Sequence, residues 1–232
     1  MDSVRDWAAS CGFDYRFLGD EIFDPLPGWY RQKLNGRMPI LADLARLYLL
    51  RDALENGHDT AVWLDADTLV FAPDAFDLGP IDATAAFGRE IWVDIDAKGK
   101  MKAWRNTHNA ACLFRKGDTT LPFLIDTTER IIARADPDRI APQMVGPKLL
   151  SALDTIAGFS KLDAVHAFSP PVIADIDRGG GPALDRLKSE IAKHRLPTPV
   201  AANLCASLIS VEKDVMRVER IIERLLSMRA LP

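Results

Sequence analysis

Residues 41–73 read LADLARLYLLRDALENGHDTAVWLDADTLVFAP, and this stretch decides the fold. Its first part has the apolar spacing of an amphipathic helix, which we expect from Ile40 to about Asn56. The apolar run 62–64 is typical of a strand buried on both faces, and Asp65 and Asp67 follow where that strand ends. Alternation along a strand predicts that both carboxylates point the same way. The order of helix, buried strand and acidic strand end therefore indicates an α/β domain with a ligand site at this edge of the sheet.

The length and composition fit one globular domain. The chain has 232 residues, of which 48% are hydrophobic and 27% charged, and this length is enough for a three-layer core. A net charge of −4 argues against a nucleic-acid partner. Cys11, Cys112 and Cys205 show no CxxC spacing, which predicts reduced thiols. No apolar run is long enough for a transmembrane segment and no signal-peptide pattern is present, so we expect a cytoplasmic protein, free or peripheral at the inner membrane surface.

Apolar periodicity predicts the remaining elements of a single domain spanning 1–232. We expect further helices at 3–10, 29–34, 121–135, 148–156, 183–194 and 211–229, and strands at 13–18, 83–87, 110–114 and 162–168. We interpret the charged segment 88–102 and the glycine-rich segment 178–182 as loops. The last helix, 211–229, carries both charge signs on its polar face, so we expect it to pack on its own domain or on a second copy in a homodimer.

Two charge patterns surround the acidic strand end. Asp43 and Arg46 are three positions apart on the expected helix and can reach each other. Asp65 and Asp67 are like charges held close together, and such a pair needs a cation, a shared proton or a chemical task. Less specific interpretations stay open: an ordinary surface ion pair in the helix, and carboxylates that cap a helix or face water at the strand end.

The helix Ala42-Asp43-Leu44-Ala45-Arg46 and the strand end Asp65-Ala66-Asp67-Thr68 together resemble a known family. They resemble the DXD group of GT-A-fold glycosyltransferases, which includes capsular-polysaccharide and mannosyl transferases and the clostridial glucosylating toxins. The resemblance implies that Asp43 and Arg46 contact the donor sugar. It also implies that Asp65 and Asp67 are the catalytic acids that hold Mn²⁺ or Mg²⁺ and the nucleotide.

Softer similarities extend over roughly residues 37–210. Asn109 opens a segment similar to the strand beside the family's donor-sugar pocket, and Gly146 lies in a turn similar to a second part of that pocket. Asn203 stands where a histidine usually completes metal binding, so the resemblance implies a third, weaker metal ligand there. Cys205 stands where the family often has tryptophan. Arg178, in the glycine-rich segment, could reach a phosphate.

The resemblance implies a GT-A-like three-layer α/β/α domain around a mostly parallel, nucleotide-binding (Rossmann-like) sheet. The implied reaction is transfer of a sugar from a UDP- or GDP-sugar donor to a glycan or other hydroxyl acceptor, with retention at the anomeric carbon, as in polysaccharide synthesis. The family opens with a strand that helps to bind the base. Nothing ahead of Ser3 supplies that strand, so we expect that the natural start lies upstream.

Two other functions remain as alternatives. The segment 62–70 also resembles the first motif of haloacid-dehalogenase-type phosphohydrolases, in which Asp65 would be the nucleophile and Asp67 the general acid/base, with Mg²⁺ between them. Such enzymes need a later lysine and a second acidic pair, and they leave Asp43 and Arg46 unexplained. The third alternative is a non-catalytic nucleotide-sugar-binding domain, which the substitution at Asn203 and the missing strand would explain.

Overall fold

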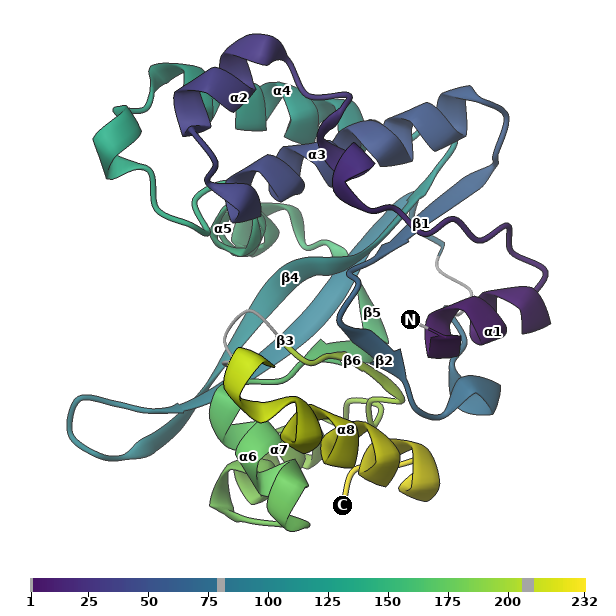
Figure 1. Ribbon diagram of the computed structural model, residues 1–232, viewed down its shortest axis with the longest axis vertical. Helices are drawn as coiled ribbons and strands as arrows, with labels where there is room; N and C mark the ends of the chain where they lie inside the picture. Colours follow the sequence, from purple (N-terminus) through teal and green to yellow (C-terminus); the bar gives the residue numbers. More distant parts are fainter. Residues whose placement is uncertain (1, 79–81, 206–210) are drawn as a thin grey trace.

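The computed structural model describes residues 2–78, 82–205 and 211–232, the side chains of 211–215 excepted. Its helices are α1 (Asp2–Ser10), α2 (Gly28–Leu34), α3 (Met38–Glu55), α4 (Thr120–Arg134), α5 (Pro147–Ala157), α6 (Pro170–Arg178), α7 (Pro182–Lys193) and α8 (Val211–Met228). Its strands are β1 (Thr60–Leu64), β2 (Thr68–Val70), β3 (Ala85–Ile95), β4 (Met101–Arg115), β5 (Ser160–Ala167) and β6 (Ala201–Asn203). Short 3₁₀ helices occupy Asp20–Phe23, Pro73–Ala75 and Pro137–Arg139. The expected α/β class is confirmed (Figure 1).

The sheet is mixed, and the expectation of a mostly parallel sheet is wrong. The strand order in the described residues is β1-β4-β3-β5-β6-β2. The pairs β1–β4, β3–β4 and β2–β6 are antiparallel, and only β3–β5 and β5–β6 are parallel. The physical reason is the long hairpin of β3 and β4, whose short connection forces the two strands to run in opposite directions. Residues 88–102, which we expected to form a loop, contain most of β3, the turn of this hairpin and the first residues of β4.

The sheet curls so that its two edge strands meet. β1 and β2 lie at opposite ends of the strand order, yet only residues 65–67 separate them in the chain. Every strand contributes apolar side chains to one cluster inside the curl, which also receives Trp7 of α1. These strand residues are Val62, Leu64, Val70, Ala86, Ala111, Leu113, Leu162, Val165 and Ala201. We call the side of the sheet that carries them the inner face.

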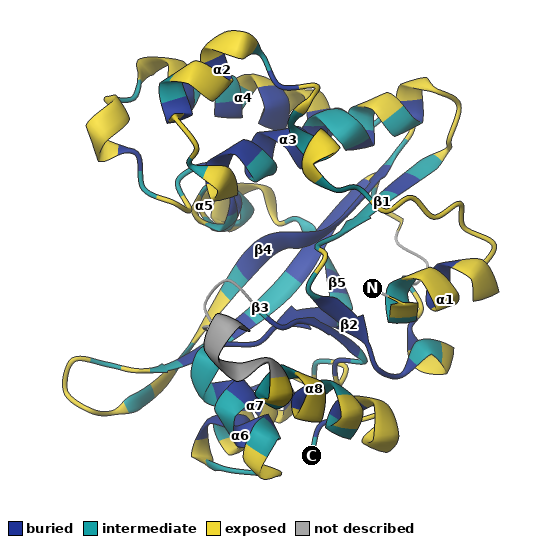
Figure 2. Cartoon of the chain, in the orientation of Figure 1, coloured by how far each residue is buried: buried dark blue, intermediate teal, exposed yellow. Residues whose placement is uncertain are grey.

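Two groups of helices cover the outer face at successive places along β3. Ala85 and Phe87 pack in the cluster that includes α2, α3, α4 and α5. Ile91 and Val93, which point the same way from β3, pack in the cluster that includes α6, α7 and α8. The two groups lie above and below the diagonal hairpin in Figure 1, and Figure 2 shows their buried sides against the sheet. The arrangement leaves the middle of the sheet, where β1 ends, between the two groups.

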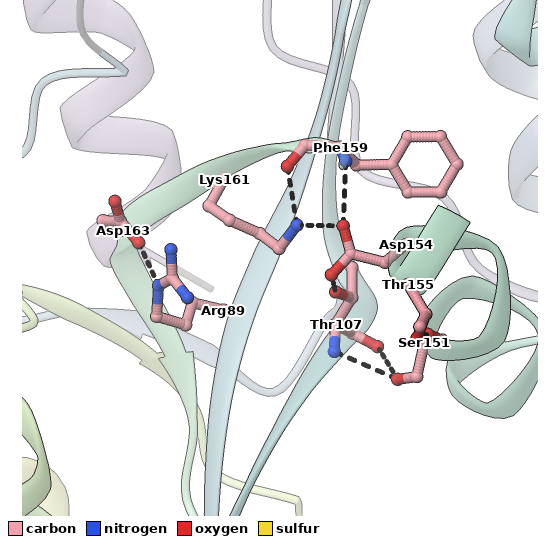
Figure 3. A network of polar contacts seen from close by, with 8 residues as sticks. All are labelled: Arg89, Thr107, Ser151, Asp154, Thr155, Phe159, Lys161 and Asp163. Atoms are coloured by element: carbon pink, nitrogen blue, oxygen red, sulfur yellow. Dashed lines mark hydrogen bonds and ion pairs between the residues drawn. The ribbon is translucent and has the colours of Figure 1, made fainter. Parts of the chain in front are cut away.

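Helix α5 is fastened to the sheet by a polar network (Figure 3). Asp154 accepts hydrogen bonds from the Lys161 ammonium at 2.6 Å, from the Thr107 hydroxyl at 2.8 Å and from the Phe159 backbone N–H at 2.8 Å. Burial alone would raise the pKa of Asp154, but these hydrogen bonds outweigh it and lower the pKa. The Ser151 hydroxyl accepts from the Thr107 backbone N–H at 3.1 Å. The network holds the middle and the end of α5 against β4 and β5.

Several local predictions differ from the structure. The segment 13–18 forms no strand, because no neighbouring strand pairs with it in the described residues. Strands β2 and β6 and helix α6 were not predicted, since each is short and begins next to polar or proline residues that indicate turns. Ile221 and Leu225 of α8 are buried in the cluster with α6 and α7. No described helix is both long and apolar enough to cross a membrane.

Candidate functional site

The two acids of the Asp-x-Asp motif lie in a tight turn rather than on the strand. β1 ends at Leu64, and the Thr68 backbone N–H donates to the Asp65 carbonyl at 2.9 Å. The Asp65 backbone N–H still pairs with the Ala110 carbonyl at 2.8 Å, so the turn begins at the last rung of the β1–β4 ladder. Ala66 is exposed at its tip and the two acids are half-buried. Strand alternation, the reason we gave for both carboxylates pointing the same way, therefore does not apply.

Arg46 joins α3 to this turn. Its guanidinium lies 3.1 Å from the Asp65 carboxylate and 3.6 Å from the Asp43 carboxylate, and it donates to the Asn109 carbonyl at 2.5 Å. Asp65 also accepts from the Trp63 indole N–H at 2.6 Å, and the Arg46 guanidinium lies 5.7 Å from the centre of the Trp63 ring. The side chains of Arg46 and Asp43 are only 8% and 6% exposed, against 26% for Asp65. Asp43 and Arg46 therefore belong to a buried cluster of hydrogen bonds and ion pairs, and they are not the ordinary surface ion pair that was the alternative interpretation.

Asn109 and Gly146 complete the surroundings of Asp43. The Asn109 side-chain amide donates to the Asp43 carboxylate at 2.7 Å. A Cβ atom on Gly146 would lie 2.4 Å from one Asp43 carboxylate oxygen, so only glycine fits there without a shift. A cavity of about 10 Å³ lies beside Asp43 and Asn109, close to the volume that one water molecule needs. The structure therefore brings together Asp43, Arg46, Asn109 and Gly146, but in this conformation the cavity beside them is too small for a sugar.

The electrostatics follow from one cation shared between two acids. Burial raises the pKa of Asp43 to about 6, although Arg46 and the Asn109 amide both favour its charged form. Burial would lower the pKa of Arg46, but Asp65 and Asp43 outweigh it and the pKa is raised. Asp65 is the closer partner of the two. Arg46 is thus a permanent positive charge whose position is set by both carboxylates.

Asn203 holds Asp67 on the other side of the turn. The Asn203 side-chain amide donates to the Asp67 carboxylate, and its carbonyl oxygen accepts from the Cys205 backbone N–H at 2.7 Å. The Leu204 backbone N–H donates to the Asp67 carbonyl at 3.0 Å. Because the amide oxygen of Asn203 is the atom that could ligate a cation and it already accepts from Cys205, the expected role of Asn203 as a third metal ligand does not fit this arrangement. Asn203 instead orients Asp67.

The partly exposed carboxylates of Asp65 and Asp67 are the candidate metal ligands at this turn. In the described parts of the chain no three His, Cys, Asp or Glu side chains are grouped so that they could hold a metal ion. Mg²⁺, and by the same preference for oxygen Mn²⁺, is commonly bound through one or two carboxylates plus substrate phosphates and water. Asp65 and Asp67 could bind a cation in that way, with water and a phosphate-bearing ligand completing the coordination.

Arg178 lies apart from these residues. It is the last residue of α6, and its guanidinium pairs with the buried carboxylate of Asp175, which lies three positions earlier in the same helix. The same carboxylate accepts from the backbone N–H groups of Ala183 and Leu184 at 2.6 and 3.1 Å, which caps the start of α7. The glycine-rich segment is therefore a tight helix–helix connection, and the structure does not bring Arg178 to the acidic turn.

Sequence reasoning missed Glu90, which lies on the same inner face as Asn203. The strand registers place Asn106, Glu90, Ala167, Asn203 and Thr68 side by side across β4, β3, β5, β6 and β2. The Asn106 amide donates to the Glu90 carboxylate at 2.6 Å, and burial raises the pKa of Glu90. After burial itself, Asp67 and then Glu90 raise the pKa of Cys205, to about 12. Glu90 was overlooked because we interpreted 88–102 as a loop, where a charged residue carries no signal.

Comparison with protein-family models, with curated proteins and with solved structures gave no match to this chain.

Proposed function

We propose that this protein is a metal-dependent glycosyltransferase that moves a sugar from a nucleotide-sugar donor, a UDP- or GDP-sugar, to a hydroxyl acceptor. The observation that carries the proposal is the contact of Arg46 with both Asp43 and Asp65. Asp43 and Arg46 lie three positions apart on one helix, and Arg46 also binds Asp65 at the end of β1. This is the arrangement that the Asp-x-x-Arg and Asp-x-Asp patterns imply. Asn109 and Gly146, the softer points of the same resemblance, touch the same Asp43 carboxylate.

The buried cluster supports a positioning role for Arg46 and Asp43. Their side chains are enclosed, whereas Asp65 is partly open to solvent. Arg46 and the Trp63 indole bind one oxygen of Asp65 and so fix the carboxylate in direction. Asn203 does the same for Asp67 from the other side of the turn. Rigidly held carboxylates lose little conformational entropy on binding a cation or a substrate, and this is what a precise donor site requires.

Asp65 and Asp67 are the residues that would hold Mg²⁺ or Mn²⁺. The cation would offset the negative charge that gathers on the departing nucleoside diphosphate. The two carboxylates would balance one divalent charge, and Arg46, 3.1 Å from Asp65, holds that carboxylate in place. The acidic turn thus serves a phosphate-bearing donor only together with a cation, which makes metal dependence a direct consequence of the proposal.

The surroundings of Asp65 favour the transferase over a phosphohydrolase. A nucleophilic carboxylate needs a free oxygen directed at the phosphorus and a nearby lysine to accept the developing charge. Arg46 and Trp63 both bind the same oxygen of Asp65, so the other oxygen stays available, but the cation beside it is a buried arginine already shared with Asp43 and not a lysine. A carboxylate that serves to hold a cation is better matched to this arrangement.

The experiment is a screen of UDP- and GDP-sugars, with Mn²⁺, with Mg²⁺ and with EDTA, by thermal shift and by donor hydrolysis. We expect one nucleotide series to stabilise the protein only with metal, and Asp67→Ala to lower metal-dependent hydrolysis by more than about 100-fold. Asp126→Ala removes an exposed acid of α4 and serves as the matched control, with hydrolysis unchanged.

Three results would count against the proposal. The first is the absence of any metal-dependent response to a nucleotide sugar. The second is hydrolysis that persists in a folded Asp67→Ala variant. The third is Mg²⁺-dependent cleavage of p-nitrophenyl phosphate with a phosphorylated Asp65, which would establish the phosphohydrolase instead.

A further inference from the structure

Two tryptophans are cross-strand partners on the inner side of the β3–β4 hairpin. The register pairs Trp92 with Trp104, directly beside the pair Glu90 and Asn106. Side chains two positions apart on a strand share a face, so both tryptophans lie on the same face as Glu90. Trp92 is half-buried and Trp104 is 42% exposed. The opposite face of this hairpin is closed by α7 and α6, where Ile91 is buried.

The pair of tryptophans continues the candidate site. The row of residues on the inner face runs from Asn106 and Glu90 across Ala167 to Asn203, which holds Asp67. Glu90 and Asn203 are two strand spacings apart, roughly 10 Å. The residue between them is Ala167, whose small side chain rises little above the sheet. The face thus presents in order Asn203 with its partner Asp67, a polar pair and an aromatic pair.

We propose that Trp92, Trp104, Glu90 and Asn106 form the acceptor subsite and that they bind a sugar ring of a glycan. The inference rests on the proposed function and adds the chemical class of the acceptor. A pyranose ring has an apolar face of C–H groups and a rim of hydroxyls. Indole rings offer the flat apolar surface that such a face covers, while a carboxylate and an amide bind the hydroxyls.

The position of the tryptophans argues for a sugar over a membrane surface. An inserting hairpin carries its aromatic residues at the tip with an excess of basic residues around them. Here the tip carries Asp94 and Asp96 beside Lys98, Lys100 and Lys102, so its charges nearly balance, and Asp96 pairs with Lys102 at 2.8 Å. The tryptophans lie farther back along the strands. Polar pairs flank them on both sides: Glu90 and Asn106 on one, Asp94 and Lys102 on the other. A flat aromatic surface set between hydrogen-bonding groups matches a ring with a polar rim.

The test uses the full chain on an array of defined oligosaccharides, followed by titration of the best-bound glycan. We compare wild type with Trp104→Ala, with the conservative Trp104→Phe, and with Trp29→Ala. Trp29 lies on α2 and is also 42% exposed, so its replacement controls for the loss of an exposed indole. We expect Trp104→Ala to weaken glycan binding by about tenfold, Trp104→Phe to retain most of it, and Trp29→Ala to leave it unchanged.

Each outcome decides the proposal. Loss of affinity in Trp104→Ala but not in Trp29→Ala, with both variants folded by circular dichroism, supports the subsite. No glycan bound by wild type, or equal binding by Trp104→Ala, overturns it, as does Trp104-dependent sedimentation with phosphatidylglycerol vesicles without glycan binding. The nucleotide-sugar thermal shift of the wild type is measured separately. If glycan binding depends on Trp104 but no nucleotide sugar shifts the melting temperature, the subsite is supported and the transferase is rejected. If a nucleotide sugar gives a metal-dependent shift but no glycan binding depends on Trp104, the transferase is supported and the subsite is rejected.

Discussion

The guanidinium of Arg46 lies 3.1 Å from the carboxylate of Asp65, and this contact joins the middle of α3 to the end of β1. Arg46 also pairs with Asp43 within its own helix at 3.6 Å. One buried cation therefore fixes the position of a helix and of the acidic turn together. Because an arginine can donate in several directions from one rigid plane, it can serve both acids and the Asn109 carbonyl at once.

Replacement of Arg46 by lysine should lower both stability and activity. A lysine ammonium is a point charge that cannot span both carboxylates, so at least one buried acid loses its partner, and breaking a buried pair costs about 3–5 kcal/mol. We expect Arg46→Lys to lower the free energy of unfolding in urea by about 2 kcal/mol or more. Arg51→Lys, on the same helix with an exposed partner at 3.8 Å, is the control, with a change within about 1 kcal/mol. Equal stability of the two variants would contradict the role of Arg46.

Replacement of Gly146 by alanine should disturb Asp43. The added Cβ would lie 2.4 Å from an oxygen of the Asp43 carboxylate, so the methyl group and this carboxylate would have to move apart. We expect a loss of about 1–3 kcal/mol in chemical denaturation. Gly28→Ala, at a position with nothing within 4 Å, should be neutral. The double variant Gly146→Ala/Asp43→Ala should lose less than the sum of the single variants, and simple additivity would show that the two residues do not touch.

Replacement of Asn203 by aspartate should strengthen metal binding at the acidic turn. It places a carboxylate against Asp67, where the wild type has an amide donor, and like charges that close favour either a proton or a cation. We expect a lower melting temperature in EDTA and about tenfold tighter Mn²⁺ binding by calorimetry. Asn56→Asp adds the same charge at an exposed position and should bind Mn²⁺ as the wild type does. Unchanged Mn²⁺ affinity in the Asn203→Asp variant would show that Asp67 is not a metal ligand.

The buried His166 should make the fold sensitive to acid. Burial, His108 and Arg89 lower the pKa of His166 to about 3, and both ring nitrogens are buried without a hydrogen-bond partner. Below the ordinary histidine pKa the unfolded chain binds a proton that the folded protein refuses, so the stability present at neutral pH is lost as the pH falls. For a folded pKa of about 3, this histidine alone costs about 2 kcal/mol between about pH 7 and about pH 5.

The check is the free energy of unfolding as a function of pH for His166→Leu and for His58→Leu. The first variant should show a shallower decline toward acid than the wild type. The second, whose side chain is 48% exposed, should follow the wild-type slope. A wild-type slope that His166→Leu leaves unchanged would assign the acid sensitivity to other groups.

Local patterns predicted the part of the site that lies on neighbouring segments. The spacing of Asp43 and Arg46 places them on one face of α3, and the apolar run before Asp65 requires a strand that ends there. Both predictions depend only on the periods of a helix and a strand, which a sequence displays directly. The family resemblance alone placed Asn109 and Gly146 near the site, and nothing in the sequence predicted their contacts with Asp43, since no period links such distant residues.

The remaining parts depend on partners that a local pattern does not reveal. Glu90 and Trp92 lie in the segment 88–102, whose charges suggested a loop, and Trp104 lies just beyond it. A hairpin with one face against α6 and α7 and the other partly open alternates polar and apolar residues only weakly. The direction of the Asn203 amide depends on the Cys205 backbone N–H and on Asp67, which meet only after β2 pairs with β6.

The sequence by itself determined the α/β class, the α3–β1 pair and the acids that the pair presents, because helix and strand periods are properties of consecutive residues. The tertiary structure alone decided that the sheet is mixed and curled and that Asn203, which binds Asp67, shares one face of the sheet with Glu90 and the tryptophans. The physical reason is that strand pairing joins backbone groups far apart in the chain. Which face a side chain occupies, and which residues it meets there, is therefore fixed only when the register of every strand is set.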